Sequence, residues 1–174
     1  MTAIAGGTVA SADFNTYIRD NLNATAPALA TVVSSWFPAS GVNTLAERYP
    51  AQANTSGSST TTSTTYGNLA DAVTTSVTVA TGTMALVSIF CNLTNSIGGG
   101  NPNRTWMSFA VSGATTIAAD DCRSVNHASS SGMRWGSTFL RDALTPGNNT
   151  FTLQYRTSTG TGTFSVRRIA VVPF

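Results

Sequence analysis

Apolar side chains recur at every second position in the C-terminal half of this chain, and that spacing restricts it to extended strands. Between 150 and 156, Phe151, Leu153 and Tyr155 alternate with polar residues. Successive side chains of a strand point to opposite faces of its sheet, so this pattern predicts a strand with one buried face. A helix would need apolar residues three and four positions apart.

The same signal predicts further strands on both sides of this segment. Val77 and Val79 alternate with polar residues, and the run at 84–91 is apolar on both faces, which indicates a central strand. Strands are also expected around 107–111, 134–141 and 163–172. The residues expected to point inward are Met107, Phe109, Val111, Phe151, Leu153, Tyr155, Phe164 and Val166. Short turns between these strands predict a mainly β fold, an antiparallel β-sandwich or jelly-roll-like domain.

Helical periodicity is confined to the N-terminal segment 11–23. Ser11 can cap the helix and Asp13 favours the positive end of its dipole. The apolar residues Phe14, Tyr17, Ile18 and Leu22 form one narrow stripe, so the short amphipathic helix must pack against something. Either its own β-domain or partner subunits can cover the stripe. We favour an assembly interface, made of Phe14, Tyr17, Ile18, Arg19, Asp20 and Leu22.

An extended arm is expected between this helix and the strands. The Thr- and Ser-rich segment 54–65 has two interpretations, a mobile linker or a polar edge strand packed against a neighbouring subunit. Its many β-branched residues slightly favour the edge strand. The sequence therefore predicts a helix and extended assembly arm at 1–72, followed by a β-sandwich domain at 73–174.

Composition argues against several partners. The net charge is +2 and only 9% of the residues are charged, with the arginines scattered along the chain, so a nucleic-acid partner is not expected. Neither a signal peptide nor an apolar run long enough to span a bilayer is recognisable, so no membrane partner is expected.

Residues suited to catalysis are few. His127 is the only histidine and stands before three serines, Ser129–131, in an expected loop. Asp120, Asp121 and Asp142 are the candidates to orient it as the base of a nucleophile–base pair, but a solvated loop histidine is the favoured interpretation. We therefore expect no enzyme.

No cofactor or metal site is expected either. The adjacent carboxylates of Asp120 and Asp121 are only a weak calcium candidate, and two cysteines with one histidine do not make a zinc site. Cys91 and Cys122 can form a disulfide or remain two separate buried thiols, and we favour the thiols.

Four stretches of the chain carry a resemblance to a known group of proteins. They are FNTYIRDNL at 14–22, FAVSGATT at 109–116, LTPGNNTFTLQYR at 144–156 and FSVRRIAVVPF at 164–174. They resemble small virion structural proteins, capsid-decorating or minor tail proteins, of tailed bacteriophages that infect actinobacteria. The resemblance implies a location in the virion and carries no catalytic residues.

Taken together, these features predict a non-enzymatic structural protein on the particle exterior, made in the bacterial cytoplasm. Its expected partners are other copies of itself, with a homotrimer favoured by analogy, and the major capsid or tail proteins. The alternative is a tail-fibre module that binds glycan of the host envelope. Three aromatic residues are candidates for that contact: Tyr66, Trp106 and Trp135.

Overall fold

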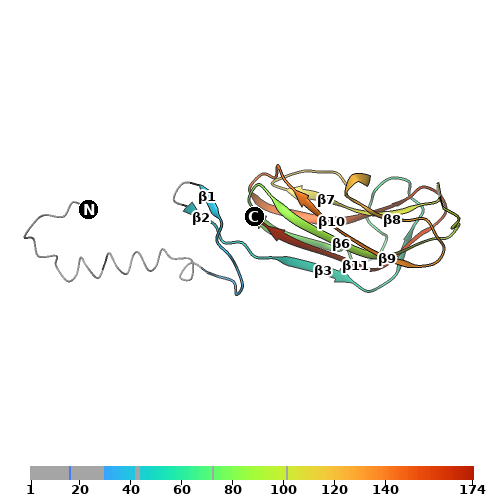
Figure 1. The fold of residues 1–174 in the computed structure, drawn as a ribbon, viewed down its shortest axis with the longest axis horizontal. Coiled ribbons are helices and arrows are strands. Elements are labelled where there is room, and N and C mark those ends of the chain that lie inside the picture. Colours follow the sequence, from blue (N-terminus) through green and yellow to red (C-terminus); the bar gives the residue numbers. More distant parts are fainter. Residues whose placement is uncertain (1–15, 17–29, 42–43, 72, 101) are drawn as a thin grey trace, which may run out of the picture. The chain divides into compact units, whose positions relative to one another are not determined.

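The computed structural model describes residues 16, 30–41, 44–71, 73–100 and 102–174 (Figure 1). The chain divides into two compact units, Met1–Glu47 and Arg48–Phe174. Thr16 has helical geometry, but the other residues of the expected N-terminal helix, including all six assigned to an assembly interface, lie outside the described residues. In the described part, no helix is long and apolar enough to cross a membrane.

In the first unit, a short two-stranded sheet precedes a carboxylate that accepts several hydrogen bonds. Strands β1 (Ala39–Gly41) and β2 (Thr44–Leu45) pair antiparallel. The Glu47 carboxylate accepts hydrogen bonds from the backbone N–H groups of Thr31 and Val32, at 2.7 and 2.9 Å, and from the Thr31 hydroxyl. These bonds lower the pKa of Glu47 to about 2, and the Thr31 hydroxyl contributes most.

The second unit is an antiparallel β-sandwich, as the alternation predicted. Its elements are β3 (Ala51–Thr55), β4 (Ser59–Thr61), β5 (Ser76–Thr81), β6 (Ala85–Asn95), β7 (Thr105–Gly113), the 3₁₀ helix η1 (Asp121–Arg123), β8 (Val125–His127), β9 (Met133–Arg141), β10 (Gly147–Thr157) and β11 (Gly162–Pro173). One sheet has the order β5-β10-β7-β8. The other has the order β3-β11-β6-β9, with β4 also paired to β11. The run expected to be central forms most of β6, between β11 and β9.

The strand pairs are nested along the chain. Strand β7 pairs with β8, β6 with β9, β5 with β10, and β3 with β11. Such nesting is a long antiparallel hairpin rolled up so that its strands alternate between two sheets, which is the jelly-roll arrangement. Two further pairs, β10 with β7 and β11 with β6, join the inner strands of each sheet, and β4 pairs with β11.

The sandwich begins earlier in the chain than the sequence indicated. Strands β3 and β4 hydrogen-bond to β11, so the segment 51–61 belongs to the sandwich sheet and not to an arm ending at residue 72. Of the two interpretations of 54–65, the strand is the correct one for the end of β3 and for β4. The partner strand, however, is β11 of the same chain and not a neighbouring subunit. The polar Thr and Ser composition suits an edge with one solvent-facing side.

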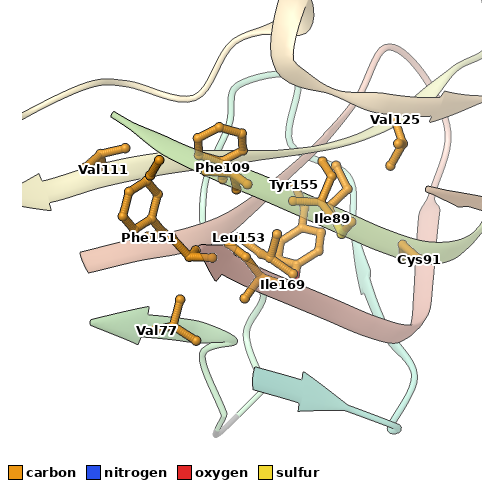
Figure 2. Packing of buried hydrophobic residues seen from close by; sticks show 14 of the residues in the cluster. Val77, Ile89, Cys91, Phe109, Val111, Val125, Phe151, Leu153, Tyr155 and Ile169 are labelled. Atoms are coloured by element: carbon orange, nitrogen blue, oxygen red, sulfur yellow. The ribbon is translucent and has the colours of Figure 1, made fainter. Parts of the chain in front are cut away.

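Side chains from both sheets meet in one hydrophobic core (Figure 2). Phe109 of β7 and Phe151 of β10 lie side by side, with ring centroids 6.2 Å apart, and both are fully buried. Seven of the eight residues expected to point inward are buried: Met107, Phe109, Val111, Phe151, Leu153, Tyr155 and Phe164.

Val166 is the exception, and a β-bulge explains it. The register between β11 and β6 shifts between Ser165 and Arg168, so that two residues of β11 face Cys91. Val166 takes a φ of 52°, which is strained for a β-branched side chain. The bulge reverses the alternation, and Arg167 points into the core in place of Val166.

Candidate functional site

A cluster of four side chains lies on the outer face of the β5-β10-β7-β8 sheet. The arginine cluster consists of Tyr66, Trp106, Asp121 and Arg156. Trp106 and Arg156 are cross-strand partners on β7 and β10, so their side chains project from the same face. An isolated bridge between Gly67 and Tyr155 holds Tyr66 beside the end of β10.

Arg156 is the centre of this cluster. Its Nε donates to Asp121 Oδ1 at 3.0 Å and its terminal nitrogen forms an ion pair with Oδ2, so the contact is bidentate. The guanidinium also stacks on the Trp106 ring, 3.8 Å from the centroid, and lies 5.4 Å from the Tyr66 ring centroid. The Tyr66 hydroxyl donates to Asp121 Oδ1 at 2.8 Å.

Electrostatics in the cluster stabilise the ionised carboxylate. Hydrogen bonding from Arg156 lowers the pKa of Asp121, and the Tyr66 hydroxyl adds to the effect. The pKa of Tyr66 is raised, first by its burial and then by the bond to Asp121. Asp121 thus stays an acceptor held by two donors, which suits a structural contact better than proton transfer.

The arginine cluster holds the η1 segment against the sheet. Asp120 caps η1 by accepting from the Cys122 N–H at 2.6 Å. The Ser108 hydroxyl of β7 lies 2.9 Å from the carbonyl oxygens of both Asp120 and Arg123 and can donate to either one. The Ser124 hydroxyl donates to the Asp121 carbonyl at 2.7 Å. These hydrogen bonds hold residues 120–124 in one position immediately before β8.

A groove of about 400 Å³ opens beyond this segment, between the edge strands of the two sheets. The β8–β9 groove is lined by Ser124, Val125, Asn126, Trp135, Gly136 and Ser137. Trp135 is the cross-strand partner of the buried Cys91, so its side chain lies on the core side of its sheet. It is nevertheless 45% exposed. Strand β9 has nine residues and β8 only three, so β8 leaves part of the inner face of β9 uncovered.

The structure separates the three aromatic residues proposed for glycan contact. Tyr66 and Trp106 come together in the arginine cluster, where the guanidinium covers one face of the Trp106 ring. Trp135 lies in the β8–β9 groove with its ring half exposed. The alternation did place Trp106 and Arg156 on outward faces, but alternation alone does not define the strand register that makes them neighbours.

The residues considered for catalysis do not meet. His127 belongs to β8 and is half-buried, not a solvated loop residue, and its Nε2 lies 3.0 Å from the Ser131 carbonyl oxygen. Among the described contacts, Asp120 pairs with Arg123 at 3.3 Å, Asp121 with Arg156, and Asp142 with Arg141 at 3.7 Å. Within the described residues, no group of three or more potential metal ligands occurs.

The two cysteines are free thiols in different surroundings. Cys91 is fully buried, and this burial raises its pKa to about 12. Cys122 is exposed on η1, which corrects the expectation that both thiols are buried.

No protein-family model matches the chain, and no curated protein matches it. Among solved structures, Eiger TNF from S. frugiperda aligns over 73% of this chain and 92% of its own, with 13% identity and a TM-score of 0.49. Infectious bursal disease virus, Gt strain, aligns over 84% of this chain and 40% of its own, with 11% identity and a TM-score of 0.42. Dimeric latent PorU from Porphyromonas gingivalis aligns over 70% and 13%, with 14% identity and a TM-score of 0.29. Likenesses at this level carry no conclusion about function.

Proposed function

We propose that this protein is a non-enzymatic structural component on the exterior of a tailed-bacteriophage virion, a capsid decoration or minor tail protein. The observation that carries the proposal is the division of the chain into two units after Glu47. The second unit has a jelly-roll core made from its own strands. The stretches of sequence that resemble virion structural proteins lie in both units. A self-contained domain joined to a separate N-terminal unit suits a protein that attaches by one part and displays the other.

The jelly roll is compatible with this role but does not select it. Viral coat domains use the fold, and so do lectin domains. Function therefore has to be argued from surfaces and not from topology. In this protein about half of the outward strand positions carry Thr, Ser or Asn, an uncharged polar surface that suits contacts with other proteins.

We further propose that the protein acts through contacts with copies of itself, as a homotrimer, and with the major capsid or tail proteins. The proposed contact residues are Phe14, Tyr17, Ile18, Arg19, Asp20 and Leu22 in the first unit. Their apolar stripe supports a packing role.

Mass spectrometry of separated heads and tails from purified particles tests the proposal directly. We expect the protein in one of the two fractions in stoichiometric amount. A variant lacking residues 1–47 should stay folded and be missing from particles, whereas the full-length Leu140→Ala variant, changed at an exposed position of the sandwich, should be incorporated normally. Absence of the protein from both fractions would contradict a virion role. Hydrolysis of envelope polymers that disappears in His127→Ala would contradict a non-enzymatic one.

A further inference from the structure

The β8–β9 groove has the dimensions of a ligand site. Its volume of about 400 Å³ lies in the usual range of roughly 300 to 1,000 Å³ for small-molecule pockets. The groove lies between β8 and β9, two facing edge strands of different length, so the arrangement of the strands produces it. Trp135, one of its lining residues, is half exposed, an unusual position for a large apolar group on the inner side of a sandwich.

The lining chemistry selects an uncharged ligand. None of the six lining residues carries a charge, and polar groups come from Ser124, Asn126 and Ser137. An indole face combined with the hydroxyl groups of Ser124 and Ser137 complements a molecule that has apolar C–H faces and a rim of hydroxyls. We propose that the β8–β9 groove is a binding site for a neutral saccharide, with a sugar ring stacked on Trp135.

One wall of the groove is held in place before any ligand arrives. The Ser124 hydroxyl is bonded to the Asp121 carbonyl, and the arginine cluster holds the Asp121 side chain. Asn126, the cross-strand partner of Trp106, accepts from Arg104 through its Oδ1 at 2.8 Å, and this bond holds β8 in place. Groups fixed in this way lose little conformational entropy when a ligand binds.

The main competing occupant is a second copy of this chain, since β9 is also an edge strand. Pairing along that edge would use backbone groups of β9 and its outward side chains, such as Leu140, which is 63% exposed. The Trp135 and Ser137 side chains point instead toward the interior side of the sheet, where they line the groove. A small ligand in the groove uses these two side chains directly.

Calorimetric titration of the purified full-length protein tests the proposal without reference to any virion. The probes are neutral oligosaccharides of glucose, mannose, galactose or arabinose, with an oligogalacturonate as the charged comparison. We expect at least one neutral probe to bind and the charged one to bind more weakly. Trp135→Ala should weaken binding by roughly tenfold or more, Trp135→Phe by less because it keeps a ring, and Ser137→Ala by about threefold through loss of one hydrogen bond.

The matched control is Leu140→Ala, which removes an exposed apolar side chain from the same strand outside the groove. It should bind the saccharide as the unchanged protein does. Circular dichroism and melting of each variant check that the fold is retained. Three outcomes would overturn the proposal: no neutral probe binding at up to about 10 mM, binding unchanged in both Trp135 variants, or self-association that Trp135→Ala and Leu140→Ala abolish together while no probe binds.

Discussion

Arg167 and Asp71 form an ion pair that joins the bulge of β11 to the segment preceding β5. The Arg167 side chain is only 1% exposed and that of Asp71 is 26% exposed. The guanidinium also lies 5.8 Å from the centroid of the Tyr155 ring. The bulge therefore introduces a charge into the sandwich, and Asp71 neutralises it.

Removing the carboxylate should be costly for that reason. Asp71→Asn leaves a buried guanidinium without its counter-charge, and we expect the free energy of unfolding to fall by about 2 to 3 kcal/mol in urea denaturation. Adding Arg167→Met removes the buried charge as well and should restore much of the loss. If Asp71→Asn alone is neutral, the pair does not contribute to stability.

Two glycines of the sandwich should respond differently to alanine. Gly113 has a φ of 104°, and an added Cβ would lie 2.4 Å from the Asn148 carbonyl oxygen. We expect Gly113→Ala to destabilise the protein by about 1 to 2 kcal/mol from the backbone conformation alone, and by more through the clash. Gly57 is the control, because a Cβ there would meet nothing within 4 Å. Equal unfolding free energies for the two variants would show that Gly113 tolerates a side chain.

The two thiols should differ in reactivity. In the folded protein, a thiol-specific reagent at neutral pH should modify Cys122 and leave Cys91 unmodified, since Cys91 is buried and its pKa is raised to about 12. Denaturant should expose the second thiol. The Cys122→Ser variant should then react only after unfolding, and rapid reaction of that variant in buffer would contradict the buried position of Cys91.

Acid should weaken the contact between Glu47 and Thr31. The pKa of Glu47 is lowered from 4.5 to about 2, so the ionised carboxylate stabilises this contact above pH 4.5, and the stabilisation is lost as the pH falls toward 2. Titration of the Glu47 carboxyl by NMR should give a midpoint near 2. In Thr31→Val, which lacks the hydroxyl that contributes most, the midpoint should move up toward 4.5. If the midpoint of Glu47 is the same in Thr31→Val, the Thr31 hydroxyl is not the main cause of the lowered pKa.

Period-two alternation was sufficient for the strands and for most of the core. Phe151, Leu153 and Tyr155 are buried because regular strands keep side chains on the expected faces. The same reasoning was wrong for Val166, because one bulge inverts every later position, and local sequence does not mark it. The arginine cluster was not predictable, since Asp121 and Arg156 are 35 residues apart and meet only through strand register. Trp135 was a candidate from its residue type, but its groove depends on the length difference between β8 and β9.

The place of β11 in its sheet has a consequence for biosynthesis. Strands β3, β4 and β6 all leave the ribosome before β11, yet β11 is the strand that joins them. The nascent chain therefore carries open strand edges until β11 emerges, and the sheet forms through contacts between residues more than a hundred positions apart. Thr- and Ser-rich edge strands such as β4 then protect the incomplete sheet. An unpaired polar strand has less tendency to aggregate than an unpaired apolar strand.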